Sequence, residues 1–375
     1  MKPHPVPWAR VRGAILLIGL LIAVPMLAAC QAQSSASPSA AGSDAPAPTT
    51  GGSESASAEP SLAPADPVSF GVLRAPTGAL AVVTDEQGWY EDEGVEVEFV
   101  SFAEGGGPAI IQAMGGGQPD LALLNFAAVV LALGQGTFDV QIVSVAANPA
   151  EALPLIATEE IQTVEDLRGR RVSSPPSGGL YYVLAATLDK FGMTFDDIDY
   201  RPLPVGEAQA AFLTGQLDAV VSSANGSVII QDAVPGAHVL FDGTMFEPED
   251  NYASPDVIIA TREAVENNPE GISRFLQAFH ARGVPYLNDG ATHEEAIQAI
   301  QDYMTSVGAG LEELEATTKS VEGIEFYDLE RATELLSSEE FLQGANAQVD
   351  FWIETGAFDE APDVQGAINT TLIAP

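Results

Sequence analysis

Residues 68–99 read VSFGVLRAPTGALAVVTDEQGWYEDEGVEVEF, and this stretch decides the fold of the chain. Apolar and small or polar residues alternate from Val68 to Val72, which predicts a strand. Apolar residues then recur at helical spacing from Ala79 to Val83, and Gly88 ends that run. A second strand is expected from Val95 to Phe99. Strand, helix and strand in this order predict a parallel sheet covered by helices, and hence an α/β fold.

The same alternation continues through the rest of the chain. Asn268, followed by Pro269 in the first turn, is expected to cap an amphipathic helix that packs against the core. Further strands are expected at 121–124, 140–145, 171–174, 217–222, 239–241 and 257–260, and further helices at 109–114, 127–133, 180–191, 208–213, 294–304 and 328–355.

Composition excludes several functions. The chain has 375 residues, 14 Lys plus Arg, 53 Asp plus Glu and a formal net charge of −39, which disfavours nucleic acid as a partner. One Cys excludes an internal disulfide and a thiolate cluster, and four scattered His residues argue against a zinc site. We therefore expect no metal and no cofactor. The length is sufficient for one or two compact lobes.

The N-terminus has the features of a secretory signal. Basic residues precede an apolar run from Ala14 to Leu27, which is too short to span a bilayer comfortably. The sequence Leu27-Ala28-Ala29-Cys30 resembles the lipobox of bacterial lipoproteins, which implies a signal peptide over 1–29 and a lipidated Cys30. The alternative is an ordinary signal peptide with an incidental Cys. The segment 30–67 is rich in Ser, Ala, Pro and Gly, and is expected to be a disordered tether.

Four segments resemble, in order and spacing, the periplasmic solute-binding proteins of ABC importers. They are GWYEDEGVEV at 88–97, GQPD at 117–120, VEDLRGRRV at 164–172 and AAFLTGQLDA at 210–219. The resemblance is to the branch that takes sulfonates, taurine, nitrate and thiamine-pyrimidine precursors. It implies the type II two-lobed fold, in which each lobe is a mainly parallel sheet flanked by helices.

The resemblance also implies a division of the chain. Lobe one is expected over 68–157, lobe two over 158–251, and the chain is expected to return to lobe one and its C-terminal helices over 252–375. The two crossovers are expected near Leu155–Ala157 and near Tyr252–Asp256. The lobes would close like a hinge over a ligand in the cleft.

Ligands of open α/β sheets lie where the carboxyl ends of strands meet helix N-termini with free N–H groups. This rule selects residues from the expected loops of both lobes. The candidate ligand-binding residues are Arg74, Thr77, Gly78, Phe102, Gly105, Asn125, Phe126, Asn148, Ser174, Ser177, Gly178, Gly179, Tyr181, Glu207, Ser223 and Asn225.

For three kinds of candidate residue, a role in ligand binding has to be weighed against a structural role. Arg74 is the only cation between Arg12 and Arg168, so it is either the counterion of an anionic ligand or part of a structural ion pair. Ser177 is expected to cap the next helix and to present donors to the cleft. The aromatic residues near the loops would stack on a flat heterocycle or belong to the core. Asn125 and Asn225 would face each other across the cleft.

The resulting prediction is a monomeric binding lipoprotein of an ABC importer, held by Cys30 on the outer face of the cytoplasmic membrane. It would deliver a sulfonate-like anion or a pyrimidine-like heterocycle to a permease with its cytoplasmic ATPase. One alternative is a ligand-sensing lipoprotein with the same fold. Another is an enzyme like the fungal pyrimidine synthase, but Val68–Leu155 contains neither the Lys nor the His of that chemistry. No Gly-x-Ser-x-Gly motif occurs either, and we expect no catalysis.

Overall fold

The computed structural model describes residues 64–103, 106–136, 139–247, 254–309 and 313–373. Within these ranges, none of the helices combines the length and the apolar character that crossing a membrane requires. The predicted signal peptide, the lipidated Cys30 and nearly all of the predicted tether lie outside the described residues.

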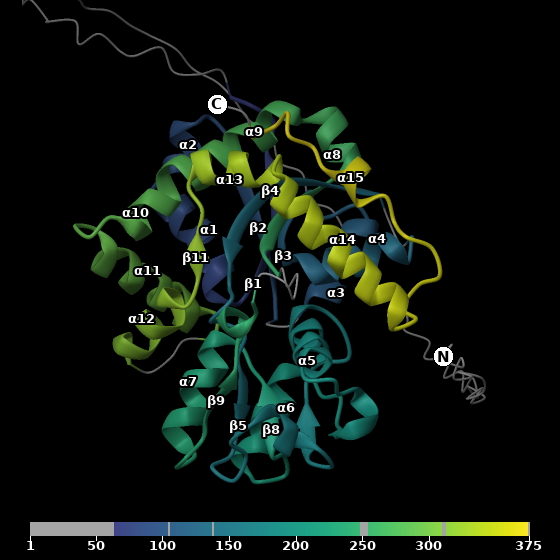
Figure 1. The fold of residues 1–375 in the computed structure, drawn as a ribbon. Coiled ribbons are helices and arrows are strands. Elements are labelled where there is room, and N and C mark those ends of the chain that lie inside the picture. The colour runs from purple at the N-terminus through teal and green to yellow at the C-terminus, as the bar shows by residue number, and fades with distance from the viewer. Residues whose placement is uncertain (1–63, 104–105, 137–138, 248–253, 310–312, 374–375) are drawn as a thin grey trace, which may run out of the picture. The chain divides into compact units, whose positions relative to one another are not determined.

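Two sheets organise the chain, and each defines a lobe (Figure 1). The sheet of lobe one has the strand order β11-β4-β10-β3-β1-β2. Strands β1 to β4 share one direction, whereas β10 and β11 run antiparallel to them. The bounds are β1 Val68–Leu73, β2 Val97–Phe102, β3 Leu121–Asn125, β4 Val140–Asn148, β10 Asp256–Thr261 and β11 Glu325–Phe326.

The sheet of lobe two has the order β7-β6-β8-β5-β9, and β5 runs antiparallel to its neighbours β8 and β9. Most strands of each sheet therefore share a direction, which confirms the predicted α/β fold with mainly parallel sheets. The bounds are β5 Leu155–Ala157, β6 Arg171–Ser173, β7 Asp199–Tyr200, β8 Ala219–Val221 and β9 His238–Phe241.

Helices follow the strands in both lobes. In lobe one they are α1 Pro76–Glu86, α2 Trp89–Asp92, α3 Gly107–Gly115, α4 Phe126–Gly134, α8 Arg262–Asn267, α9 Pro269–Ala278, α10 Val284–Asn288, α11 His293–Ser306, α12 Leu314–Glu322, α13 Leu329–Leu336, α14 Glu339–Glu354 and α15 Val364–Ala367. A π-helical turn at Phe279–Gly283 joins α9 to α10. In lobe two they are α5 Gly179–Lys190, α6 Val205–Leu213 and α7 Ala224–Ala233, with short 3₁₀ turns at Val164–Leu167, Phe195–Asp197 and Gly243–Met245.

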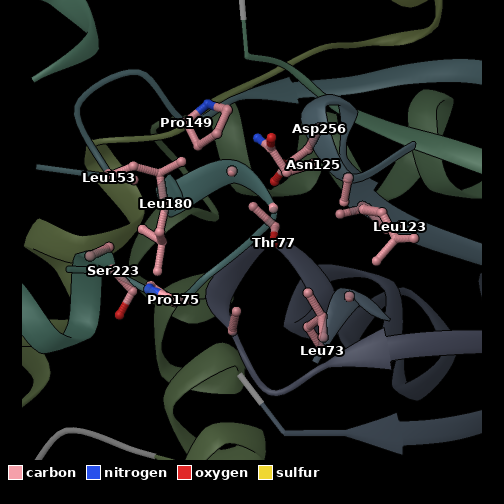
Figure 2. A pocket seen from close by; sticks show the side chains of 18 of the residues that line it. Leu73, Thr77, Leu123, Asn125, Pro149, Leu153, Pro175, Leu180, Ser223 and Asp256 are labelled. Carbon is pink, nitrogen blue, oxygen red and sulfur yellow. The ribbon is translucent and has the colours of Figure 1, made fainter. Parts of the chain in front are cut away.

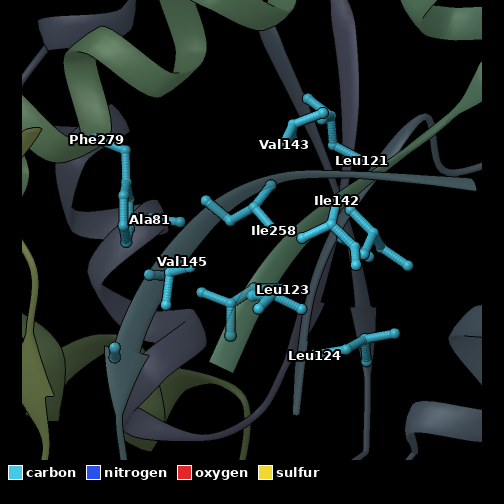
Figure 3. Packing of buried hydrophobic residues seen from close by; sticks show 14 of the residues in the cluster. Ala81, Leu121, Leu123, Leu124, Ile142, Val143, Val145, Ile258 and Phe279 are labelled. Carbon is cyan, nitrogen blue, oxygen red and sulfur yellow. The ribbon is translucent and has the colours of Figure 1, made fainter. Parts of the chain in front are cut away.

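The core of lobe one forms because both faces of its sheet are covered. All four residues of Leu121–Leu124 are at most 2% exposed, although successive side chains point to opposite faces. Leu123 packs with Ile142, Ile258 and the neighbouring strand residues, and Phe279 closes the cluster from the helical layer (Figure 3). Asn268 caps α9 as predicted, since its side chain accepts a hydrogen bond from the N–H of Gly271.

The chain crosses between the sheets twice. The first crossover follows β4 and precedes β5, so the segment Leu155–Ala157 lies within the second sheet rather than in the connection. The second crossover leads into β10, which begins at Asp256. Helix α7 was not expected, because Asn225, Gly226 and Ser227 favour a loop. Ser223 starts this helix by accepting a hydrogen bond from the N–H of Gly226.

Candidate functional site

A pocket of about 130 Å³ lies between the two lobes. Both lobes and the first crossover supply its walls, as the labelled residues from Leu73 to Asp256 show (Figure 2). Residues at the N-terminal ends of five helices, α1, α3, α4, α5 and α7, are among those that line it. Strand β10 also reaches this edge, because it is antiparallel and therefore begins where β3 ends. The lining residues are Leu73, Ala75, Pro76, Thr77, Gly107, Pro108, Leu123, Leu124, Asn125, Ala128, Pro149, Ala152, Leu153, Pro175, Ser177, Gly178, Gly179, Leu180, Ser223, Ala224, Asp256 and Ile324.

Asn125 and Asp256 form the polar centre of the pocket. The side-chain amide of Asn125 donates to the backbone carbonyl of Ser254 at 3.0 Å and to Oδ1 of Asp256 at 3.2 Å. Its carbonyl oxygen accepts from the N–H of Ala127 at 3.2 Å and from the hydroxyl of Ser254 at 3.1 Å. Asn125 is thereby held in one orientation, with Asp256 beside it (Figure 2).

The Asp256 carboxyl has an unusual proton affinity. It is 7% exposed, and burial raises its pKa to about 7, although hydrogen bonds from Asn125 and Thr77 act in the opposite direction. The carboxyl therefore changes charge near neutral pH. A ligand that donates an N–H to this group would favour the ionised form.

The lining has a simple charge pattern. Among its 22 described residues Asp256 carries the single ionisable side chain, and neither Lys nor Arg nor His occurs. The other polar groups of the walls are the side chains of Thr77, Asn125, Ser177 and Ser223 and the N–H groups at helix N-termini. Over the described ranges, His, Cys, Asp and Glu side chains form no cluster of three that could hold a metal ion.

Six of the predicted site residues line the pocket: Thr77, Asn125, Ser177, Gly178, Gly179 and Ser223. The glycines of this set have distinct roles. Gly178, at φ +82°, occupies the cap position of α5, so the prediction that Ser177 caps this helix is wrong. Gly179 approaches Asn125 so closely that an added Cβ would lie 2.7 Å from the Asn125 Cγ.

The structure does not bring Arg74 into this pocket. Its Nη1 donates to the carbonyl of Val307 at 3.2 Å, at the C-terminal end of α11. Carbonyl groups at a helix C-terminus attract a guanidinium group, and this local attraction accounts for the direction of the side chain. The prediction that Arg74 is a ligand counterion receives no support from this position.

The predicted aromatic residues also lie outside the lining. Phe126 is fully buried against Phe341, with ring centroids 5.1 Å apart, and belongs to the core. The Tyr181 ring stacks on the rings of Trp352 in α14 and of Phe195, with centroid distances of 5.7 Å and 5.0 Å. Because Trp352 belongs to lobe one and Tyr181 to lobe two, this stacking is a contact between the lobes. Proline and leucine side chains form the apolar walls instead.

The remaining predicted residues have other surroundings. Asn225 donates to the carbonyl of Ala309 at 3.2 Å, so the prediction that it faces Asn125 is wrong. Ser174 lies within hydrogen-bond distance of the Tyr200 hydroxyl, at 3.2 Å. Gly78, Phe102, Asn148 and Glu207 are not among the lining residues, and Gly105 lies outside the described residues.

The candidate site residues chosen from the sequence included neither Asp256 nor the prolines that line the pocket. Asp256 begins a strand, and only the antiparallel direction of β10 brings the start of that strand to the ligand edge. Pro76, Pro149 and Pro175 each lie within three residues of the end of a strand, and this recurrence was a usable signal.

The fold is that of the two-lobed periplasmic binding proteins. Residues 76–289 match the NMT1/THI5 like family, and the chain belongs to this family. A protein of Brucella abortus (strain 2308), provisionally named a binding protein, is 28% identical over 220 residues, which cover 58% of this chain and 66% of that protein. The chain thus spans slightly less than two thirds of this relative's length.

Other similar proteins differ in the function that their names state. The formylaminopyrimidine-binding protein of Halalkalibacterium halodurans is 27% identical over 201 residues, covering 52% of this chain and 58% of that protein. The structure of the periplasmic aliphatic sulphonate binding protein SsuA from Escherichia coli matches with a TM-score of 0.66 and 19% identity, covering 81% of this chain and 92% of SsuA. The structure of the desulfurization enzyme DSZB matches with a TM-score of 0.55 and 14% identity, and the match covers 82% of this chain and 97% of DSZB.

Proposed function

We propose that this protein is the extracytoplasmic solute-binding component of an ABC importer. Its task is to capture a small solute between the lobes and to deliver it to a membrane permease with a cytoplasmic ATPase. The observation that carries the proposal is the pocket itself, because lobe one, lobe two and the first crossover all contribute to its walls. Closure of the lobes therefore completes the site, and opening releases the solute.

The chemistry of the pocket favours a small heterocycle that carries N–H groups. Asp256 offers carboxylate oxygens as acceptors, and Thr77 and Asn125 orient that carboxyl. An aminopyrimidine presents an N–H donor next to a ring nitrogen, which suits a carboxyl that changes charge near neutral pH. The pocket volume of about 130 Å³ is close to the roughly 150 Å³ of an engineered cavity that binds benzene.

An anionic solute fits this pocket less well. A sulfonate or nitrate group would meet the Asp256 carboxyl, and none of the described lining residues is a cation that could offset the repulsion. Helix N-terminal N–H groups and the hydroxyl groups of lining residues would remain as its partners, and none of these carries a full positive charge. The Halalkalibacterium relative is named as a formylaminopyrimidine-binding protein, which supports a heterocyclic ligand. SsuA is named as a sulphonate binding protein, which favours an anionic ligand.

Capture without catalysis is part of the proposal. The lining holds one ionisable side chain, Asp256, and its described serines are not paired with a histidine or lysine base. Similar proteins include both binding proteins and one enzyme, so the fold is compatible with either class. A pocket with apolar walls and one ionisable side chain fits a binding role better than a catalytic role.

Membrane attachment through a lipidated Cys30 is the proposed means of keeping the protein near its permease. The basic start, the apolar run and the Leu-Ala-Ala-Cys sequence support this attachment. Incubation of cells with labelled palmitate should label the wild-type protein and not a Cys30→Ala variant. A ligand-sensing lipoprotein is the second candidate, and import assays in a strain lacking the gene distinguish the two roles.

Calorimetric titration tests the ligand class. We expect 4-amino-2-methylpyrimidine to bind at pH 8, and ethanesulfonate to bind much more weakly or not at all. Asp256→Asn should weaken pyrimidine binding at least tenfold, because the neutral amide is a weaker acceptor. Asp189→Asn is the matched control, since Asp189 is exposed on α5 and outside the lining. Tighter binding of ethanesulfonate than of the pyrimidine would overturn the ligand class.

A further inference from the structure

A second cavity of about 450 Å³ lies beside the pocket, between helices α3 and α4. Four residues, Pro108, Ala128, Ser177 and Gly178, line both cavities and form the boundary between them. The larger cavity is continued along α3 by Ile111 and Gly115 and along α4 by Leu131 and Ala132. We name this second cavity the α3–α4 groove.

Two of the four residues on the boundary between the cavities, Ala128 and Gly178, have little or no side chain. Ala128 contributes a single methyl group, and a Cβ added to Gly178 would meet no atom within 4 Å. Space is therefore present at Gly178, on the boundary that both cavities share. A ligand bound at Asp256 would therefore extend towards the groove beside Ala128 and Gly178, where the boundary has the least bulk.

The groove is uncharged and mostly apolar, with Gln112, Gln135 and Ser177 as its polar side chains. Ile111 and Leu131 are only partly buried, so apolar surface remains exposed to water on its walls. None of the ten described residues that line the groove is charged, although the chain has a net charge of −39. Exposed apolar surface that is kept clear of charge is typical of a surface that binds a neutral partner.

We infer that the natural solute has two parts: an N–H-bearing ring held at Asp256, and an uncharged apolar substituent that lies in the α3–α4 groove. The inference rests on the function proposed above and extends it to the substrate class. The inner pocket is filled by one ring, whereas the groove has more than three times its volume. Gln112 and Gln135 also line the groove and offer amide groups to a polar terminus of the substituent.

The length of the groove sets the size of the substituent. From Pro108 to Gly115 helix α3 advances about 10 Å, since the rise is about 1.5 Å per residue. A chain of several carbon atoms spans this distance, whereas a methyl group does not. The protein should therefore distinguish ring compounds by the length of an attached chain.

Calorimetry with two series of compounds tests the inference. The compounds are 4-aminopyrimidines that carry methyl, butyl or hexyl at ring position 2 or at ring position 5. In one of the two series we expect the hexyl compound to bind at least tenfold more tightly than the methyl compound, because each fully buried methylene contributes up to about fourfold. Ile111→Gln and Leu131→Gln should remove most of this gain and leave the affinity for the methyl compound unchanged.

Ala109→Gln provides the matched control, because Ala109 is exposed on α3 and lines neither cavity. This variant should keep the full gain. The groove inference is wrong if the methyl compound binds and chain length has no effect in either series, or if both glutamine variants retain the gain. If no compound of either series binds, the ligand class proposed above is wrong, and the groove inference, which rests on it, is wrong as well.

Discussion

Gly179 of lobe two lies against Asn125 of lobe one, at a distance that leaves no room for a side chain. A Cβ on Gly179 would be 2.7 Å from both Cγ and Oδ1 of Asn125. Because the hydrogen bonds to Ser254, Asp256 and Ala127 hold Asn125 in place, the amide cannot move aside cheaply. The contact between the lobes at the pocket therefore depends on glycine at this position.

Gly179→Ala should prevent the lobes from closing on a ligand. We expect the affinity for the bound ring compound to fall at least tenfold, while the ligand-free protein keeps its melting temperature within about 2 °C. Calorimetry and thermal unfolding measure the two effects. Gly206→Ala is the matched control, since an added Cβ there meets no atom within 4 Å. Wild-type affinity in Gly179→Ala would show that this contact does not limit closure.

The raised pKa of Asp256 should make ligand affinity depend on pH. If the ionised carboxylate accepts the ligand N–H, affinity rises with pH and levels off above a pKa of about 7. Below pH 7 the affinity should fall about tenfold per pH unit. Titrations between pH 5 and pH 8.5 measure this dependence, with a ligand whose own protonation is known. Affinity that stays constant over this range, after correction for the ligand, contradicts the role of the carboxylate.

The same carboxyl should affect the stability of the ligand-free protein. Its pKa is about 7 when folded and near 3.8 when unfolded, so between these values the folded state binds the additional proton. Stability from this group therefore decreases as pH rises from about 4 to about 7. Asp256→Asn should be more stable than wild type at pH 7.5 and closely similar at pH 4, as measured by urea unfolding. A destabilised variant at pH 7.5 would contradict this expectation.

His280 should give the opposite dependence on pH. It is fully buried, its Nδ1 is 2.7 Å from the Tyr327 carbonyl and its Nε2 is 2.7 Å from the Ser144 hydroxyl. Burial lowers its pKa from 6.5 to about 4, so stability is lost as pH falls from 6.5 towards 4, by up to about 1.4 kcal/mol per pH unit. His280→Gln should lose this dependence in urea unfolding. His293→Gln, at a partly buried histidine, should retain it.

Trp352 should report the movement of the lobes. Its ring is 3% exposed and lies nearly parallel to that of Tyr181, at an interplanar angle of 12°. Separation of the lobes would expose the indole and shift its emission to longer wavelength, and ligand binding would reverse the shift. The change should persist in Trp89→Phe, because Trp89 contacts Tyr286 within lobe one. The emission shift should disappear in Trp352→Phe. If it persists in that variant, Trp352 is not the residue that reports the movement of the lobes.

The order of strands and helices could be predicted because it depends on local patterns. The strand at Val68–Val72 and the cap at Asn268 depend on neighbouring residues, and both are confirmed. The alternation of residue types is not reflected in burial, because all residues from Val68 to Val72 are buried in a sheet that is covered on both faces. The loops near the pocket could be located as well, because the carboxyl ends of parallel strands meet at one edge. Thr77, Asn125 and Ser223 were found in this way.

Side-chain directions could not be predicted, because distant partners decide them. Arg74 is directed by the carbonyl of Val307, which is 233 residues further along the chain. Tyr181 is directed by Trp352 of the C-terminal helix α14. The position of Asp256 at the pocket could not be predicted for a related reason. It depends on the direction of β10 relative to β3, which is a property of the whole sheet.

The position of Asp256 also constrains how this protein can diverge. The residue begins β10 directly after the second crossover, and the preceding Pro255 accepts a hydrogen bond from the N–H of Phe126 at 2.8 Å. A substitution at Asp256 would thus alter both the proposed ligand partner and the start of the strand that follows the second crossover. Substitutions of Leu153 or Leu180 change only the shape of the walls. Over evolution, new solute preferences should accumulate at the apolar walls while the acid at the crossover is retained.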